Sequence, residues 1–467
     1  MERAASTSQA SNRSRALLPR RSRRLAAALA ASVLVVPLLG GLADASVQES
    51  PGLAWAEVPV PSAVYGGLSS VSTSVTTGNL TCMSRTFCVL AGYANIFHYN
   101  AKNQLVNMYQ PLLWQWHGDS WSDVANPIPG AGSVSTGATQ GRAFTKLSGS
   151  GVLLGTACSS ATDCWAVGAK LTTGAATGVI EHWDGHSWSS SPAHPSLGVW
   201  FNAVACTTGG DCFAVGRTGP AVGGTNASSS VLVEQWDGRS WSLLVSGQKP
   251  VSALAASLDS VTCVSAQECL ALGDWYDPKG DDHFIAEEYA PYGVKKLVNG
   301  KRSERWSPVG LFDTSGYMAA MNGTGPYGVS CISVVDCLAV GNGAPYSTYR
   351  GAYFLDGVAL HWDGSSWSTL ATPKLGKYNQ SYKLNGVSCA SSGCWVALAP
   401  YGPVSPASTL LSLAHWDGQG APFQVVTTAV NGLLDAVSCL PGGSWCMAFG
   451  EKVNTTGAQF VALRGVA

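Results

Sequence analysis

Hydrophobic and polar positions follow one recurring pattern along this chain. Residues 200–246 show it in full: WFNAVACTTGGDCFAVG, then a polar segment, then VLVEQWDGRSWSLLV. Turn residues divide this stretch into four short apolar runs, FNAVAC, CFAVG, VLVEQW and SWSLLV. Runs of this length between Gly, Asp and Ser are typical of β-strands. The pattern therefore predicts four antiparallel strands, with a cysteine hairpin between the first two and a tight Asp237-Gly238 hairpin between the last two.

A close variant of this unit occurs seven times, with 48–76 residues between successive first cysteines. Four strands in a repeat of this length are typical of a propeller blade. A solenoid would stack shorter units, and a sandwich would lack sevenfold self-similarity. We therefore predict an all-β protein, a seven-bladed β-propeller with four-stranded blades.

The seventh repeat is one strand short. After Cys446 the chain has a single further apolar run, Gln459–Leu463, before it stops at Ala467. The segment LAWAEVP at 53–59 resembles the outer strand of another repeat, SWSTLATP at 366–373. We expect this N-terminal strand to complete the last blade and so to remove two exposed sheet edges.

The fourteen cysteines fall into seven close pairs, one in each repeat. Metal sites rarely occur as seven evenly spread pairs without nearby histidines, so we prefer hairpin disulfides in an oxidising compartment. Closing a loop of about seven residues contributes roughly 2 kcal/mol in the chain-entropy model. The expected pairs are Cys82–Cys88, Cys158–Cys164, Cys206–Cys212, Cys263–Cys269, Cys331–Cys337, Cys389–Cys394 and Cys439–Cys446.

A second motif, Trp-Asp-Gly-x-Ser-Trp, occurs at 183–188, 236–241 and 362–367, with variants at 116–121 and 416–420. The motif resembles the Asp-box between the third and fourth strands of sialidase-type propeller blades, although it is one residue shorter between Asp and Trp. The chain as a whole is similar to secreted actinobacterial propellers with paired cysteines. This resemblance implies a fold rather than an activity, because Asp-boxes are structural and the Phe/Tyr-Arg-Ile-Pro motif of sialidases is absent.

The N-terminus predicts export. Seven arginines in residues 1–24 precede an apolar run over 25–43, and Ala43-Asp44-Ala45 then offers a cleavage site. We expect a signal peptide at 1–45, a propeller domain at 46–467, and no transmembrane segment after cleavage. Removing the leader leaves 20 basic and 26 acidic side chains, a net charge of −6. This charge disfavours a nucleic-acid partner. We expect a monomer that is secreted or held at the cell surface.

Because successive antiparallel strands run in opposite directions, their connections lie alternately on the two faces of the propeller. Cysteine and tryptophan hairpins should share one face, while the second-to-third loops and the links between blades should form a variable face, where binding usually occurs. We expect long connections at Tyr93–Gln110, Gly130–Gly151 and 290–305. The densest cluster on the variable face is a loop over 274–283. Its candidate ligand-binding residues, together with one further tryptophan, are Trp200, Asp274, Trp275, Tyr276, Asp277, Asp281, Asp282 and His283.

Carboxylates beside aromatic rings could bind Ca²⁺ through oxygen atoms, or supply an acid/base pair next to a stacking platform for sugars. A solvated acidic loop is the simpler interpretation, and no cofactor is otherwise indicated. Tyr346, Tyr349 and Tyr401 should also fall on the variable face. Four polar residues, each four positions before a first cysteine, are interpreted as caps at strand starts: Asn202, Asp259, Asn385 and Asp435.

No Ser-His-Asp arrangement, phosphate-binding loop or dinucleotide motif is present. The favoured hypothesis is an extracellular binding or scaffold propeller for a glycan, a cell-wall component or a protein. The alternative is a carbohydrate-active hydrolase or lyase that uses carboxylates of the 274–283 loop.

Overall fold

The structure is a computed structural model in which residues 49–467 form one compact unit. The described residues are 52–60, 72–99, 105–124, 128, 150–172, 175–191, 198–219, 229–244, 253–266, 268–278, 282–289, 306–308, 326–349, 352–375, 380–400, 409–418, 422–454 and 457–467. The signal peptide expected at 1–45 lies outside them, as do the connection at 290–305 and nearly all of the link at Gly130–Gly151.

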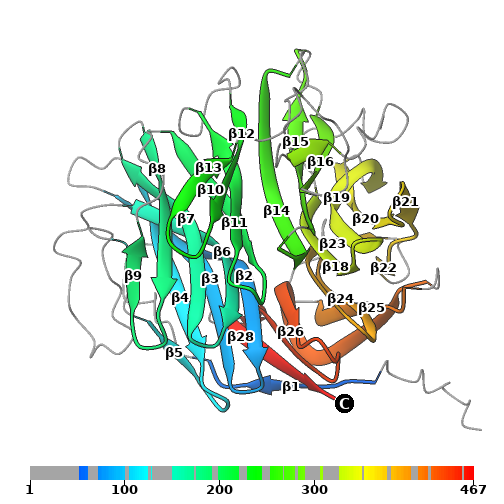
Figure 1. Ribbon diagram of the computed structural model, residues 1–467. Helices are drawn as coiled ribbons and strands as arrows, with labels where there is room; N and C mark the ends of the chain where they lie inside the picture. The colour runs from blue at the N-terminus through cyan, green and yellow to red at the C-terminus, as the bar shows by residue number, and fades with distance from the viewer. Residues whose placement is uncertain are drawn as a thin grey trace, which may run out of the picture. The chain divides into compact units, whose positions relative to one another are not determined.

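Every regular element of the described chain is a β-strand (Figure 1). The strands are β1 (Ala54–Val58), β2 (Ser72–Ser84), β3 (Phe87–Tyr99), β4 (Leu105–Trp116), β5 (Trp121–Asp123), β6 (Ser150–Ser160), β7 (Asp163–Thr172), β8 (Ala175–Trp183), β9 (Trp188–Ser191), β10 (Val199–Cys206), β11 (Cys212–Thr218), β12 (Ser230–Trp236), β13 (Trp241–Leu244), β14 (Ala255–Ser265), β15 (Glu268–Tyr276), β16 (Asp282–Tyr289), β17 (Trp306–Pro308), β18 (Pro326–Ser333), β19 (Asp336–Tyr349), β20 (Ala352–Trp362), β21 (Trp367–Leu370), β22 (Lys374–Leu375), β23 (Gln380–Ala390), β24 (Gly393–Pro400), β25 (Leu410–Trp416), β26 (Gln424–Cys439), β27 (Trp445–Asn454) and β28 (Gly457–Val466).

Five sheets hold four strands each: β2–β5, β6–β9, β10–β13, β14–β17 and β18–β21. The other eight strands form one sheet in the order β1-β28-β27-β26-β25-β24-β23-β22. The long strand β26 joins two units there, because its residues 424–427 pair with β25 and its residues 432–439 pair with β27. We number the blades 1 to 7 in chain order, so that β23–β26 form blade 6 and β26, β27, β28 and β1 form blade 7. The prediction of four-stranded blades in a propeller arrangement is confirmed.

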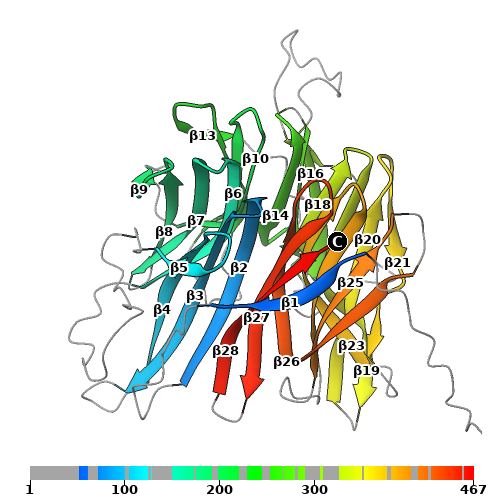
Figure 2. The same cartoon turned by 90° about the horizontal axis from the view of Figure 1, so that it is seen from below.

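The N-terminal strand closes the last blade. β1 pairs antiparallel with β28 over its whole length, from Ala54 opposite Val466 to Val58 opposite Ala462 (Figure 2). The ring of Trp55 meets Trp395 of blade 6 edge-on, with 5.3 Å between ring centroids. The expectation from the LAWAEVP segment is therefore confirmed.

Blade 7 also packs against blade 1, so the blades close on themselves. Trp114 of blade 1 contacts Phe449 and Phe460 of blade 7, with ring centroids 5.6 and 4.6 Å apart. The backbone N–H of Cys82 donates to Ser438 Oγ of blade 7 at 3.0 Å. Buried apolar clusters join the remaining neighbours, blades 1–2, 2–3, 3–4, 4–5, 5–6 and 6–7.

Both kinds of hairpin lie at the same end of the strands. The second cysteine of a blade pairs directly with the first hairpin tryptophan, as in Cys212 opposite Trp236 and Cys337 opposite Trp362. The turn glycines have positive φ, 89° at Gly238 for example. The aspartate before that glycine accepts two backbone N–H groups, which closes the turn. The expected sharing of one face by the two hairpin types is confirmed.

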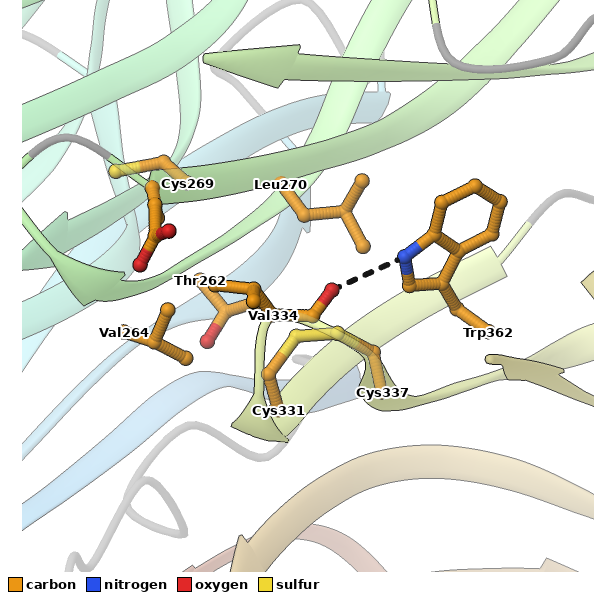
Figure 3. Close-up of a pocket in the computed structure, with 9 residues that line it drawn as sticks. Thr262, Val264, Cys269, Leu270, Cys331, Val334, Cys337 and Trp362 are labelled. Carbon is orange, nitrogen blue, oxygen red and sulfur yellow. Dashed lines mark hydrogen bonds between the residues drawn. A yellow bond between two sulfur atoms is a disulfide. The ribbon is translucent and has the colours of Figure 1, made fainter. Parts of the chain in front are cut away.

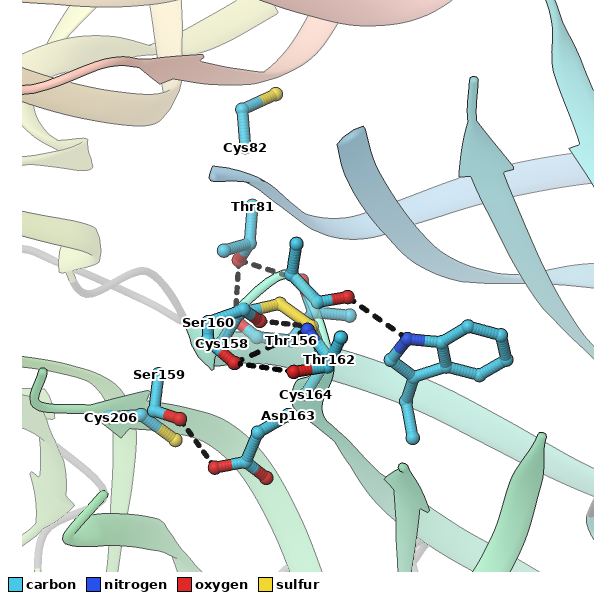
Figure 4. The surroundings of a disulfide bond; sticks show 12 residues. Thr81, Cys82, Thr156, Cys158, Ser159, Ser160, Thr162, Asp163, Cys164 and Cys206 are labelled. Atoms are coloured by element: carbon cyan, nitrogen blue, oxygen red, sulfur yellow. Dashed lines mark hydrogen bonds between the residues drawn. A yellow bond between two sulfur atoms is a disulfide. The ribbon is translucent and has the colours of Figure 1, made fainter. Parts of the chain in front are cut away.

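All seven expected disulfides are present, and the chain has no free cysteine. Figure 4 shows the surroundings of Cys158–Cys164, where Thr81 Oγ1 of blade 1 donates to Thr156 O of blade 2 at 2.8 Å. Similar hydrogen bonds join other neighbouring blades, because Ser330 Oγ accepts from the N–H of Cys389 at 2.9 Å. The inner strands are thus linked blade to blade as well as by apolar packing.

Two expected loops are partly strand. The connection expected at Tyr93–Gln110 is wrong in extent, because β3 continues to Tyr99 and β4 begins at Leu105, with the two strands paired throughout. In blade 4, β15 runs through Tyr276 and β16 begins at Asp282. Residues 274–276 and 282–283 of the expected loop therefore lie in paired strands.

Candidate functional site

Every first strand carries a β-bulge at the same place, four residues before its first cysteine. A bulge leaves one residue unpaired and re-aims its side chain. Because the first strands of propeller blades line the central channel, we call this level the channel mouth. The bulged residues are Gly78, Leu154, Asn202, Asp259, Tyr327, Asn385 and Asp435. The interpretation of four of them as caps at strand starts is wrong, since each lies inside its strand.

Asn202 connects blade 3 to blade 4 at the channel mouth. Its Nδ2 atom, which has two hydrogens to donate, lies within hydrogen-bond distance of three acceptors: Ser257 Oγ at 2.9 Å, Leu258 O at 2.9 Å and Asp259 Oδ1 at 2.8 Å. Ser257 Oγ also donates to Asp259 Oδ1 at 2.8 Å. One carboxylate oxygen therefore receives two hydrogen bonds, an arrangement that stabilises a negative charge.

Asp274 lies next to this group on β15. Its carboxyl is hydrogen-bonded to Asp259 and to Tyr276, and it is opposite Ser257 in the β14–β15 register. Burial raises the pKa of Asp274, while the hydrogen bonds and the nearby Arg217 charge oppose that rise. Two carboxyl groups in direct hydrogen-bond contact share one proton, because like charges at that distance repel. Asp259 and Asp274 therefore lie side by side as a carboxyl pair.

The positive charge beside this pair belongs to Arg217 of β11. Arg217 is the cross-strand neighbour of Trp200, and its guanidinium carbon lies 5.3 Å from the centroid of the Trp200 ring. The Trp200 ring also packs against an apolar cluster of blade 2 that includes Val152 and Ala169. We call Trp200, Arg217, Asn202, Asp259 and Asp274 the mouth cluster.

Blades 6 and 7 carry a related pair on the same level. Asn385 Nδ2 donates to Asp435 Oδ1 at 3.0 Å and to Leu434 O at 3.2 Å. Lys383 stands two residues before Asn385; burial lowers its pKa and the Asp435 charge opposes the fall. The Asn–Asp bridge between neighbouring blades thus occurs twice among the described residues.

Among the other predicted ligand-binding residues, Tyr276 is hydrogen-bonded to Asp274 of the mouth cluster, whereas Trp275, Asp277 and His283 lie against one another. The rings of Trp275 and His283 stack at 4.1 Å, and His283 Nε2 lies 3.7 Å from Asp277 Oδ2. Because Trp275 also packs against the apolar cluster between blades 3 and 4, its ring is not an open platform. Asp282, Tyr346 and Tyr349 lie in strands described by backbone alone, and Asp281 and Tyr401 lie outside the described residues.

A small pocket lies at the opposite end of the strands, between the cysteine hairpins of blades 4 and 5 (Figure 3). Leu270 and Val334 contribute to its apolar lining, and Trp362 Nε1 donates to Val334 O at 3.1 Å. Glu268 is the one ionisable side chain in the lining besides the disulfide-bonded cysteines. We place the candidate site at the mouth cluster instead, because polar groups able to orient a ligand converge there.

Neither a metal-binding cluster nor a membrane-spanning helix occurs in the described ranges. There, no three His, Cys, Asp or Glu side chains lie close enough together to hold a metal ion. The same residues include no helix that is long and apolar enough to cross a membrane.

Comparison with known proteins gives little beyond the fold. No protein-family model matches the chain, and no curated protein matches it. Among solved structures, the chain is similar to the β-propeller domain of Cps50 (Swd1) from Myceliophteria thermophila, with a TM-score of 0.39 and 9% sequence identity. The match covers 84% of this chain and 99% of that chain. A similarity at this level carries no information about function.

Proposed function

We propose that this protein is an extracellular binding propeller that holds a polyhydroxylated ligand, a glycan or cell-wall component, at the mouth cluster of blades 3 and 4. One observation carries the proposal: Asn202, Ser257, Asp259, Asp274 and Tyr276 form a connected polar network at a bulged position of the inner strands. Carboxylates, amides and hydroxyls are the groups that accept and donate hydrogen bonds to sugar hydroxyls. Seven disulfides support an oxidising location.

The binding test compares Asp259 with Asp435, the residue at the equivalent position of blade 7, which serves as the control. Purified protein, with disulfides intact, is screened against glycans and cell-wall fragments, and hits are measured by calorimetry. Asp259→Asn should weaken binding at least tenfold, because one charged hydrogen-bond acceptor is lost. Asp435→Asn, at the equivalent position of blade 7, should leave binding unchanged. An equal loss in both variants, or a screen without hits, would contradict the proposal.

A carbohydrate-active hydrolase or lyase is the second candidate. It is favoured by the raised pKa of the buried Asp274 carboxyl beside a second carboxyl, Asp259, since paired carboxyl groups can carry out acid/base catalysis. Glycosidases, however, keep their two carboxyl groups about 5 Å or more apart, whereas these two are hydrogen-bonded to each other. Turnover of a polysaccharide panel that is abolished by Asp274→Asn would favour the enzyme over the binder.

A further inference from the structure

We propose that the cysteine hairpins of blades 4 and 5 form a docking site for a protein partner, one that inserts an apolar side chain flanked by Lys or Arg. The site surrounds the small pocket between these two hairpins (Figure 3). It lies at the opposite end of the strands from the mouth cluster. It is therefore a second binding surface, and it does not depend on the proposed binding of a glycan.

The first observation is an apolar surface on these hairpins. Val264 lines the pocket and is 38% exposed, while Ile332 and Val335, on the hairpin that forms the other wall, are 38% and 54% exposed. No other cysteine hairpin of the described chain exposes a large apolar side chain to this extent. The repeat does not require one, because the other blades hold small or polar residues at the position of Val335: Thr86, Thr162, Gly210, Gln267, Ser392 and Ser444. Exposed apolar patches of this kind are typical of interaction sites.

The second observation is the pocket itself. Leu270 and Trp362 in its lining belong to the buried cluster that joins blades 4 and 5, so the core holds these walls in place. Trp362 Nε1 donates to Val334 O at 3.1 Å, which leaves the indole no hydrogen to offer a ligand. The empty space is about 310 Å³ with the open mouth included. Because small-molecule sites begin at about 300 Å³ without such an opening, this pocket is suited to a single side chain.

The third observation is negative charge at the edge of the pocket. Glu268 is exposed and is itself one of the lining residues. The exposed Asp363 belongs to a turn that lies against Val335, because a Cβ atom on Gly364 would collide with Val335 Cγ1. An apolar anchor with Lys or Arg on either side would therefore meet both an apolar pocket and carboxylates around it.

The hairpin end of the propeller is negatively charged beyond this pocket as well. Each of the five tryptophan motifs contains an aspartate, and the described hairpins hold two arginines. An acidic residue also precedes the second cysteine in blades 2 to 5: Asp163, Asp211, Glu268 and Asp336. Histidines pair with two of these four, at 2.7 and 2.9 Å. A second copy of this chain would bring like charges together, so the charge favours a cationic partner.

One segment of this chain has the same chemistry as the proposed partner. Residues 290–305 connect β16 to β17 at the hairpin end of blade 4, since β16 ends at Tyr289 opposite Cys269. The segment has five basic side chains and one acidic side chain. It lies outside the described residues, so a variant without it is part of the test.

A peptide selection tests the apolar part of the site. Random peptides displayed on phage are selected on the immobilised protein with its disulfides intact, and the enriched peptides are measured by calorimetry. We expect them to share an aliphatic or aromatic residue next to Lys or Arg. Val264→Ser should weaken their binding about tenfold, because an anchor loses apolar contact at the pocket. Leu243→Ser, at a residue of β13 that is 47% exposed, is the matched control and should leave the affinity unchanged.

The charge of the site is tested with the same peptides. Glu268→Gln should weaken their binding several-fold, and it should reduce the loss of affinity between about 0.05 and 0.5 M salt. Asp211→Asn removes the acidic residue at the equivalent position of blade 3 and should have no effect on the affinity.

A selection without enriched peptides, enriched peptides without basic residues, or peptides that bind Val264→Ser as tightly as the wild type would overturn the proposal. A wild-type dimer that Val264→Ser dissociates would overturn it too, since the occupant would be a second copy. The last variant replaces residues 290–305 by the Asp-Gly-Ser-Ser turn of blade 5. Peptide binding that becomes tenfold tighter in this variant would assign the pocket to the chain's own segment, whereas equal binding supports an external partner.

Discussion

At the scale of single residues, small side chains next to the cysteines do more than fill space. Ser388 and Ser438, each directly before a first cysteine, accept hydrogen bonds from the N–H groups of Cys439 and Cys82 in the next blade, at 2.9 and 3.0 Å. A small residue precedes the first cysteine of every repeat, but the sequence alone gives no hint of these hydrogen bonds. A hydroxyl at this place satisfies a backbone donor that the edge of an inner strand would otherwise leave unpaired.

The first prediction concerns Ser438. We expect Ser438→Ala to lower the free energy of unfolding by about 1–3 kcal/mol, because the N–H of Cys82 is buried and would lose its acceptor. Guanidinium denaturation with the disulfides intact measures the change. Ser242→Ala, a substitution at an exposed residue of β13, is the control and should change the stability little. Equal effects from the two variants would contradict the proposed role of Ser438.

The second prediction concerns a buried carboxyl. Glu181 of β8 is fully buried, and its Oε2 atom has no hydrogen-bond partner among the described residues, while Oε1 accepts from Ser190 at 2.8 Å. Burial raises the pKa of Glu181 to about 7. The folded state therefore holds this proton more tightly than the unfolded chain, so stability should fall as pH rises from about 4.5 to about 7 and then level off.

Glu181→Gln should remove that fall. We expect the variant to match the wild type near pH 4 and to be more stable by on the order of 1–3 kcal/mol near pH 8, where the wild-type carboxylate is charged and buried. Denaturant unfolding at the two pH values measures the difference. Glu268→Gln, at an exposed position, serves as the control. A stability gain of the same size at both pH values would show that the charge of Glu181 is not the cause.

At the scale of elements, the hairpins were predictable and the bulges were not. Asp-Gly turns and paired cysteines are local signals, so the two hairpins of a blade follow directly from the sequence. The bulge changes the register that those hairpins imply. Counting back from Cys206 opposite Cys212 would place Trp200 opposite Thr218, whereas the bulge at Asn202 places it opposite Arg217. The mouth cluster could not be assembled from spacing alone for this reason.

The third prediction concerns one hairpin disulfide. Replacing Cys206 and Cys212 together by Ala should cost about 2 kcal/mol, because the bridge closes a loop of seven residues in the unfolded chain. The other six bridges remain, so the propeller should still fold. Thermal unfolding and a thiol count by mass spectrometry measure the outcome. An unchanged unfolding temperature would show that the bridge contributes nothing once the blade is packed.

At the scale of the whole molecule, closure depends on residues from both ends of the chain. Blade 7 takes its fourth strand from β1, and it packs on blade 1 through Trp114, Phe449 and Phe460. Lys452 of β27 forms an ion pair with Glu57 of β1. This closure could be predicted because the missing strand leaves a gap in an otherwise regular repeat. The ligand could not be predicted, since the repeat describes what the blades share and the mouth cluster lies where they differ.

The fourth prediction concerns this closing strand. A chain that starts at residue 60 would leave β28 as an open edge, so we expect it to self-associate through that edge. Size-exclusion chromatography with light scattering measures the association. Trp55→Ala keeps the strand but removes its contact with Trp395, and it should lower stability by about 2 kcal/mol or more without causing association. A truncated chain that stays monomeric and as stable as the wild type would show that β1 is dispensable.

The shared strand β26 makes blades 6 and 7 mechanically unlike the others. Because one continuous strand serves as the outer edge of blade 6 and the inner edge of blade 7, neither blade can separate without breaking the ladder of its neighbour. These two blades should exchange their amide hydrogens as one cooperative block, whereas the five independent sheets can open one at a time. This block includes both β1 and β28, so it can be completed only after the last strand of the ring has been made.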